Sequence, residues 1–211
     1  MIFKLEQVCI TYHDRSTIGP VNLSIPEGGK VAITGKSGSG KSSLLRGLLG
    51  LASASEGTIH SQDQPLTDTA VTAIRQQVAY IPQEPLLGEG TAEAALLLPF
   101  TFRANKGKRP DPSTITSALE RLELPASLLN QSVSTLSIGE KQRLCVLRAL
   151  LLGKRIFILD EITSGLDARS KALVLNAFSD KTFTVISASH DEDWLRGCRV
   201  IYDLEKCRER S

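Results

Sequence analysis

The sequence lacks the features that mark membrane-spanning, disulfide-bonded and metal-storing proteins. Its longest uncharged apolar run, Ala94 to Phe100, is too short to cross a bilayer. Its cysteines, Cys9, Cys145, Cys198 and Cys207, lie far apart and form no C-x-x-C pair. Neither a disulfide framework nor a cysteine metal site is therefore indicated, and we expect reduced thiols.

The sequence also lacks a strong charge of either sign. Its formal net charge of +2 argues neither for nor against a nucleic-acid partner. One segment of eight residues, Arg103 to Pro110, is rich in lysine and arginine. We interpret this basic loop as a solvated connector, because it is too short to indicate a nucleic-acid surface. No nucleic-acid partner is expected.

A glycine-rich segment lies between the apolar run 31–34 and the leucine-rich run 44–49. It matches the pattern G-x-x-x-x-G-K-S at Gly35, Gly40, Lys41 and Ser42. A strand, a glycine-rich loop and a helix in that order are the context that a phosphate-binding loop requires. A glycine turn that happens to end in Lys-Ser is the alternative, and the flanking strand and helix count against it.

The residue types in this segment suit a nucleoside triphosphate. Gly38 and Gly40 allow the backbone to curl so that its N–H groups point at an anion, and the helix N-terminus faces the same anion. Lys41 would contact the β- and γ-phosphates, and the Ser42 hydroxyl would bind Mg²⁺. The predicted phosphate-binding residues are Gly35, Lys36, Ser37, Gly38, Ser39, Gly40, Lys41, Ser42 and Ser43.

Hydrophobic periodicity predicts an α/β fold. Alternating patterns at 3–10 and 21–25 indicate two antiparallel strands, and short apolar runs indicate strands buried on both faces. The buried strands are expected at 31–34, 78–81, 156–159 and 185–188, and helices at 91–98, 114–122, from 136 onward and at 171–178. Gly50 is expected to end the helix that follows the loop.

We therefore expect a phosphate-loop NTPase core with a mainly parallel sheet, an N-terminal antiparallel β part and an inserted α-helical subdomain. Residues 1–83 and about 146–211 would form the catalytic core, and residues from about 84 to 145 the helical subdomain. The whole chain is expected to be a single domain of this kind, since about twenty residues follow the last expected strand.

Polar residues follow several of the expected strands. Gln83, Asp160 and His190 each come after an apolar strand, and open α/β sheets bind ligands at the carboxyl ends of their strands. Asp160 is placed to order a Mg²⁺ shell, and Glu161 to act as general base on the attacking water. A helix cap or an exposed acidic pair would be the alternative for Asp160-Glu161, but the phosphate loop upstream argues against it.

Six ordered motifs together resemble those of an ATP-binding-cassette (ABC) ATPase subunit, over essentially the whole chain. The resembling segments are the phosphate loop 35–42, Gln83 (the Q-loop), 136–140 (the signature), Asp160-Glu161 (Walker B with the catalytic glutamate), 164–167 (the D-loop) and His190 (the switch histidine). The family implies ATP and Mg²⁺ as ligands. It implies Ser42, Gln83 and Asp160 as metal-binding residues.

The resemblance implies further roles in nucleotide binding. Tyr12 lies where the family places an aromatic that stacks on adenine. An ordinary strand-end tyrosine is the alternative, and the place of Tyr12 upstream of the loop favours stacking. His190 would contact the γ-phosphate. Ser137 and the N–H of Gly139 would bind the γ-phosphate held by a partner subunit, and Asp167 of the D-loop is assigned to the same site. A homodimer joined through ATP would then contain two composite sites.

The signature departs from the usual family pattern. Ile138 stands where the first of two glycines is usual, and a β-branched side chain restricts the backbone there. Glu140 replaces the usual glutamine, and Ser137 with Glu140 fits a capping box. Because the hydroxyl of Ser137 and the amide of Gly139 are retained, function is expected to persist.

A finer resemblance is to the ATPase of the Fet-type iron-export transporter, carried by the segments 98–103, 110–112, 124–125, 138–143 and 160–164. It implies an integral membrane permease as partner, and a cytoplasmic location at the inner face of the cell membrane. An ABC ATPase for a different substrate is the alternative. A non-transport ABC ATPase would need a coiled-coil insertion or tandem cassettes, and a small-molecule kinase has no reason to carry the signature.

Lys41→Ala is expected to weaken ATP binding, because it removes the cation that the loop brings to the phosphates. Equilibrium titration with a fluorescent ATP analogue measures the change. A variant that binds ATP as tightly as the parent would contradict the assignment of the loop. ATP hydrolysis without any phosphate acceptor would exclude the kinase.

Overall fold

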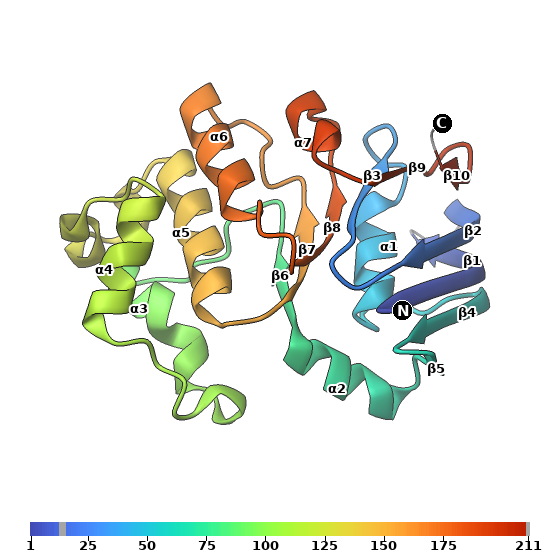
Figure 1. The fold of residues 1–211 in the computed structure, drawn as a ribbon, viewed down its shortest axis with the longest axis horizontal. Helices are drawn as coiled ribbons and strands as arrows, with labels where there is room; N and C mark the ends of the chain where they lie inside the picture. The colour runs from blue at the N-terminus through green and yellow to red at the C-terminus, as the bar shows by residue number, and fades with distance from the viewer. Residues whose placement is uncertain (13–15, 210–211) are drawn as a thin grey trace. The chain divides into compact units, whose positions relative to one another are not determined.

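The computed structural model describes residues 1–12 and 16–209, apart from the side chains of Tyr12 and Ser16. The chain forms two compact units (Figure 1). Unit 1 comprises Met1–Val78, Arg155–Glu161 and Lys181–Ser211, and unit 2 comprises Ala79–Lys154 and Ile162–Asp180. No helix of the described residues is long and apolar enough to span a bilayer.

The first sheet of unit 1 is antiparallel, with the strand order β2-β1-β4-β5. Its strands are β1 (Phe3–Tyr12), β2 (Ser16–Ile25), β4 (Glu56–Ser61) and β5 (Gln64–Pro65). Both predicted N-terminal strands are confirmed, and both are longer than expected. Phe3 and Leu5 of β1 are buried while Lys4 between them is exposed, as one buried face requires.

The second sheet is mainly parallel, with the order β10-β9-β3-β8-β7-β6. Its strands are β3 (Lys30–Thr34), β6 (Val78–Ile81), β7 (Ile156–Asp160), β8 (Thr184–Ala188), β9 (Val200–Asp203) and β10 (Arg208–Glu209). β3 pairs in parallel with β8 and β9, and β8 with β7. Every residue of β7 and β8 is buried, so both faces of this sheet are covered.

Helix α1 (Lys41–Leu48) of unit 1 packs against β1 of the first sheet and against β7 and β8 of the second (Figure 1). The approach is close, since a Cβ on Gly47 would lie 2.7 Å from Cδ1 of Ile10. The helix ends as predicted: Gly50 has φ +61°, and the Leu51 N–H donates to the Arg46 carbonyl at 2.9 Å. α1 therefore has little freedom to shift along its axis.

Unit 2 is largely helical. Its α-helices are α3 (Ala92–Leu97), α4 (Pro112–Arg121), α5 (Ile138–Leu151) and α6 (Ala168–Ala177), and α5 packs against the other three (Figure 1). Each helix begins after a residue whose side chain accepts from a backbone N–H of the first turn. These capping residues are Thr91, Asp111, Ser137 and Asp167.

Short 3₁₀ turns connect the helices of unit 2, at Leu98–Thr101, Arg103–Asn105, Ala126–Asn130 and Val133–Thr135. Two helices of unit 1 were not anticipated, α2 (Asp68–Gln77) and α7 (Glu192–Arg196). The N-caps Thr67 and Asp191 were the available signals. The division into a catalytic core and a subdomain at 84–145 stays a prediction.

Gly57→Ala is expected to destabilise unit 1 strongly. Gly57 has φ +76°, and a Cβ there would lie 2.2 Å from the carbonyl oxygen of Gln7, at the bulge in β1. Gly88 is a matched control, because its φ is +75° and nothing lies within 4 Å of its Cβ position. The left-handed backbone alone costs roughly 1–2 kcal/mol for alanine.

Urea unfolding of both variants measures the difference. We expect Gly57→Ala to lose roughly 3 kcal/mol or more, since backbone overlap adds to the conformational cost. Equal losses in the two variants would show that the strand β4 yields without cost.

Candidate functional site

The phosphate loop connects β3 to α1. Gly35, Gly38 and Gly40 all have positive φ, at +155°, +77° and +93°. Gly35 permits a close approach within the loop, since a Cβ there would lie 2.7 Å from Oγ of Ser39. Gly40 is the N-cap of α1 and has no side chain to cap it, so no side chain of the N-cap residue occupies the first N–H groups of α1. This arrangement suits an anion.

Lys41 is held over the loop by three oxygens. Its Nζ lies 3.0 Å from the carbonyl oxygens of both Gly35 and Lys36, and 3.1 Å from Oε1 of Glu161. The Lys41 side chain is only 6% exposed and that of Glu161 only 16%. A cation this deeply buried needs such partners, because desolvation of an unpaired charge is costly. The loop and the end of β7 are thereby joined.

Ser42 and Asp160 form a second link between the loop and β7. The Ser42 hydroxyl donates to Oδ1 of Asp160 at 2.9 Å, and Asp160 is 3% exposed. A hydroxyl beside a buried carboxylate is the oxygen donor set that suits Mg²⁺, which commonly binds few protein ligands and completes its shell with water and phosphate. The residues present therefore fit the metal expected with a nucleotide.

Glu161 has an unusual backbone conformation. Its φ is +47°, a region that non-glycine residues seldom adopt. Its N–H donates to the carbonyl of Ala188 at 2.9 Å, which continues the β7–β8 pairing by one residue. The turn out of β7 begins at this residue, and its carboxylate reaches Lys41. Strained backbone of this kind persists where surrounding contacts maintain it, often at functional sites.

The ends of the parallel strands β3, β8 and β7 lie side by side. The Ser189 N–H, just after β8, donates to the carbonyl of Ile33 in β3 at 3.2 Å. His190 follows directly and is exposed. The side chain of Tyr12, the predicted adenine-stacking residue, lies outside the described residues. Gln83 is exposed and belongs to unit 2, so it is described with that unit.

An unpredicted acid lies beside the phosphate loop. Oε1 of Glu205 accepts from the Lys36 N–H at 3.3 Å and lies 3.8 Å from Nζ of Lys36. Glu205 follows β9 and belongs to no motif, so only the pairing of β9 with β3 reveals it. In the same loop, the buried hydroxyl oxygen of Ser39 has no hydrogen-bond partner among the described residues. Ser37 is exposed and Ser43 half-buried.

In unit 2, Ser137 begins α5 with the predicted capping box. Its hydroxyl accepts from the Glu140 N–H at 3.2 Å, and Oε2 of Glu140 accepts from the Ser137 N–H at 2.9 Å and lies 2.7 Å from the Ser137 hydroxyl. These hydrogen bonds from Ser137 lower the pKa of the Glu140 carboxyl. Ile138 is 67% exposed, so the residue that departs from the usual signature faces outward.

Three predicted residues of unit 2, Ser137, Gly139 and Asp167, line one pocket of about 500 Å³. Asp167 caps α6 by accepting from the Ser170 N–H at 2.9 Å, and its second oxygen lies 2.7 Å from the Ser170 hydroxyl. Hydrogen bonds from Ser170 lower the pKa of Asp167. Arg143 then donates from Nη1 to the Ser170 hydroxyl at 2.7 Å.

Arg143 and Ser170 were not predicted as parts of a site. Arg143 lies one helical turn after Gly139, and Ser170 lies three residues after Asp167. Those spacings place Arg143 on the same helix face as Gly139, and Ser170 on the same face as Asp167. This spacing is the sequence signal that could have identified Arg143 and Ser170. The network connects the N-terminal turns of α5 and α6, and both ends of it line the same pocket.

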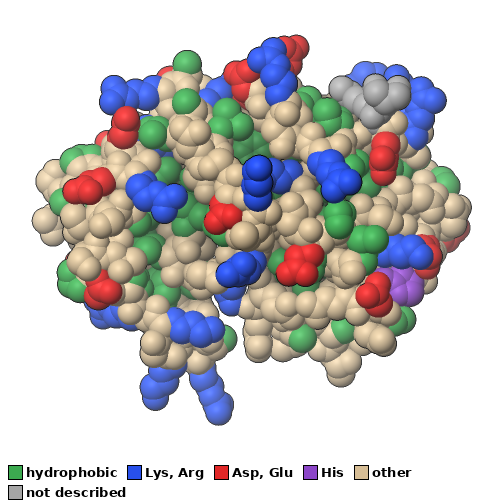
Figure 2. Space-filling model, in the orientation of Figure 1, with side chains coloured by type: hydrophobic (Ala, Val, Ile, Leu, Met, Phe, Trp, Pro, Cys, Tyr) green, Lys and Arg blue, Asp and Glu red, His purple; other side chains and the backbone are tan. Residues whose placement is uncertain are grey.

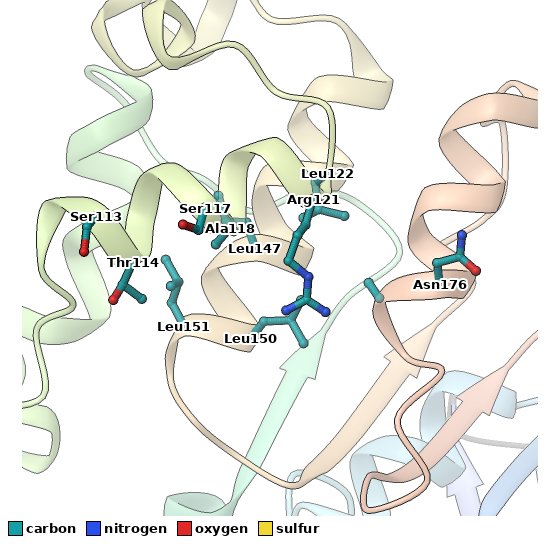
Figure 3. A pocket seen from close by; sticks show the side chains of 11 residues that line it. Ser113, Thr114, Ser117, Ala118, Arg121, Leu122, Leu147, Leu150, Leu151 and Asn176 are labelled. Carbon is teal, nitrogen blue, oxygen red and sulfur yellow. The ribbon is translucent and has the colours of Figure 1, made fainter.

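A second pocket in unit 2, of about 580 Å³, contains none of the predicted residues (Figure 3). Its lining comes from α4, from the C-terminal part of α5 and from the end of α6. Figure 3 shows Leu147, Leu150 and Leu151 on α5 opposite Asn176, with Arg121 between them. The volume of a pocket therefore does not by itself identify the residues predicted to bind nucleotide.

A family model described as "ABC transporter" matches residues 18–164 of the chain. The chain is 33% identical over 208 residues to "Probable iron export ATP-binding protein FetA" of Escherichia coli (strain K12), which covers 97% of the chain and 91% of that protein. It is 30% identical over 204 residues to "Manganese transport system ATP-binding protein MntB" of Listeria monocytogenes, with coverage of 89% and 80%.

Some curated relatives are much longer than the chain. The "ATP-dependent lipid A-core flippase" of Methylococcus capsulatus is 36% identical over 178 residues, but these are 82% of this chain and only 30% of that protein. Among solved structures, a dimeric post-hydrolysis state of the ATP-binding cassette MJ0796, bound to ADP and Pi, has a TM-score of 0.85 at 27% identity. It covers 100% of this chain and 98% of that one. These likenesses confirm the expected α/β fold class.

Ser42→Ala is expected to destabilise unit 1 and to abolish the Mg²⁺ dependence of nucleotide binding, because it leaves the buried Asp160 carboxylate without its hydroxyl donor. The loss of stability should be roughly 1–3 kcal/mol. Ser42→Thr is the control, since it retains a hydroxyl. Urea unfolding and nucleotide titration with and without Mg²⁺ measure both effects; equal behaviour of the alanine and threonine variants would refute the role of the hydroxyl.

Proposed function

We propose that this chain, which belongs to the ABC transporter family, is an ATP-binding and ATP-hydrolysing subunit that drives a separate membrane permease. The observation that carries the proposal is the meeting of the phosphate loop with the end of β7. There Lys41 contacts Glu161 at 3.1 Å, and Ser42 contacts Asp160 at 2.9 Å. A cation, a hydroxyl and two carboxylates are thus gathered beside the N-terminus of α1.

In this proposal the triphosphate lies along the phosphate loop. Lys41 contacts its β- and γ-phosphates, and the N–H groups at the start of α1 point at the same charge. Ser42 and Asp160 would hold Mg²⁺, which would neutralise phosphate charge, and Gln83 of unit 2 is the further ligand that the sequence predicts. Tyr12 stacks on the adenine, and His190 contacts the γ-phosphate.

Hydrolysis requires a group that accepts a proton from the attacking water. Glu161 takes this role: the water oxygen bonds to the γ-phosphorus, the bond to ADP breaks, and the carboxylate receives the water proton. Without nucleotide, the Glu161 carboxylate is paired with Lys41. We infer that a triphosphate attracts Lys41 and so frees the Glu161 carboxylate to orient water.

The signature pocket of unit 2 supplies the other half of the site, contributed by a second copy of the chain. Ser137, Gly139 and Asp167 line that pocket, and the start of α5 directs N–H groups outward. The likeness to the dimeric MJ0796 cassette supports this arrangement. Since one sequence carries both halves, a homodimer is sufficient.

Ser137 has two competing partners in this scheme. Its hydroxyl now lies 2.7 Å from the Glu140 carboxylate, and in the dimer it donates to a γ-phosphate. Hydrogen bonds from Ser137 hold the pKa of Glu140 below its ordinary acidic value, so this carboxylate carries a negative charge. Phosphate and carboxylate repel each other, so closure of the dimer includes movement of the Glu140 side chain.

The proposed cargo is a metal, with iron export favoured by the match to the E. coli iron-export protein along nearly the full length of both chains. The chain would act at the inner face of the cell membrane through its permease. An ATPase for a different substrate is the second candidate, favoured by relatives named for manganese and lipid transport.

Glu161→Gln is expected to bind ATP normally, to hydrolyse it at least a hundredfold more slowly, and to accumulate as a dimer with Mg-ATP. The reason is that the amide cannot accept the water proton, so the closed state persists. Size-exclusion chromatography with light scattering, with and without Mg-ATP, measures the dimer, and phosphate release measures the rate.

Parental turnover in Glu161→Gln would remove Glu161 as the general base. A monomer in both conditions, with ATP shown to bind, would lead to the same measurement on Glu161→Gln combined with Ile138→Gly. A dimer restored by that glycine would assign the defect to the signature. A monomer again would contradict the ATP-dependent homodimer.

A further inference from the structure

The segment that follows α3 combines exposed apolar side chains with exposed lysine and arginine side chains. Leu98 is 45% exposed and Phe102 57%, both large values for such side chains. The basic loop continues directly from Phe102. We define the basic–apolar patch by Leu98, Phe102, Arg103, Lys106, Lys108 and Arg109, all of which are exposed.

The charge of this patch is one-sided. The segment 98–110 contains two arginines, two lysines and no acid. None of these four cations forms an ion pair within the described residues. The nearby charge of Lys108 also contributes to lowering the pKa of Lys154, after the larger effect of burial. Figure 2 shows lysine and arginine side chains projecting where Figure 1 draws the loop between α3 and α4.

The nearest acid that follows the patch, Asp111, forms no ion pair with the patch cations among the described residues. Asp111 caps α4, where its carboxylate accepts from the Thr114 N–H at 2.8 Å and from the Ser113 hydroxyl at 2.6 Å. These hydrogen bonds, with that of Ser113 first, lower the pKa of Asp111 to about 2. Its charge is thus directed toward the helix N-terminus.

The patch is ordered by hydrogen bonds rather than being a loose connector. Phe100 is 8% exposed and anchors the segment in unit 2. The Asn105 side chain donates to the Pro99 carbonyl at 3.0 Å, and the Asn105 N–H donates to the Phe102 carbonyl at 2.9 Å. The Lys108 N–H then donates to the Asn105 carbonyl at 3.0 Å. Successive turns therefore present the cations and Phe102 in a defined arrangement.

We propose that the basic–apolar patch binds the surface of a membrane that contains anionic phospholipids. Lysine and arginine side chains contact the lipid phosphates, while Phe102 and Leu98 enter the boundary between headgroups and acyl chains. A nucleic acid would use the cations and stack on Phe102, but it offers no apolar environment for Leu98. This inference goes beyond ATP hydrolysis and involves none of the residues assigned to it.

Sedimentation with lipid vesicles tests the proposal. The purified chain is mixed with vesicles of phosphatidylcholine alone or with added phosphatidylglycerol, at low and at high salt. We expect binding to the anionic vesicles that weakens as salt rises, because surface charges are screened. Vesicle binding requires no nucleotide, so its failure would leave the proposed ATPase function untouched.

Two double variants with the same change of charge locate the contact. Lys106→Ala with Lys108→Ala should bind anionic vesicles roughly twenty-five-fold more weakly, since each basic residue near such a surface contributes about a fivefold factor. Lys181→Ala with Lys206→Ala, two exposed lysines of unit 1, should bind as the parent does. Thermal melting of both variants verifies folding.

Phe102→Trp reports the apolar contact. The single native tryptophan, Trp194, is 5% exposed, so its emission should change little. The tryptophan introduced at position 102 should shift to shorter wavelength and lose acrylamide quenching on anionic vesicles. An unshifted spectrum in the bound state would exclude insertion of this side chain.

The proposal would be overturned by equal binding of the parent to neutral and anionic vesicles, by equal losses in the two double variants, or by retention on RNA with none on vesicles. The last result would assign the basic–apolar patch to nucleic acid. Binding to a purified acidic permease without binding to vesicles would likewise replace lipid by protein as its partner.

Discussion

The burial of the Lys41 ammonium is the constraint on which the nucleotide end of the molecule depends. An ammonium that is 6% exposed would be costly without partners, and it is met by two loop carbonyls and the Glu161 carboxylate. To deliver these partners, the chain must place α1 beside the ends of β7 and β8. The parallel order β3-β8-β7, and the close packing of α1 on β1, achieve this.

The same constraint explains why one strained residue is tolerated and why glycines occupy three positions of the loop. Glu161 adopts a left-handed backbone, and three loop glycines have positive φ. Each of these backbone conformations points a charge or a backbone N–H toward the phosphate loop. A triphosphate bound there would replace the carboxylate that now pairs with Lys41. Without nucleotide, the site is therefore stabilised by the same groups that we propose bind the nucleotide. When the nucleotide binds, these charged groups exchange one partner for another and none is left unpaired.

Unit 2 differs from unit 1, because helix capping holds its proposed ligand-binding groups in place. Ser137 and Asp167 each satisfy N–H groups at the start of a helix, and Arg143 with Ser170 links the two. Since capping uses the oxygens of these side chains, stability and ligand binding compete at Ser137. On the same unit, the 3₁₀ turns after α3 give the basic–apolar patch an order that its composition alone did not suggest.

The sequence by itself determined the fold class and most strand and helix positions. It also indicated that the phosphate loop and the Asp160-Glu161 pair lie close together. Periodicity, glycines and capping residues are local signals, and they were sufficient for β1, α1 and the capping box at Ser137. Only the tertiary structure placed Glu205 beside Lys36, Ser170 beside Arg143, and Glu161 in a left-handed turn. These contacts join residues distant in sequence, and their geometry arises from strand order and helix packing, which no local pattern encodes.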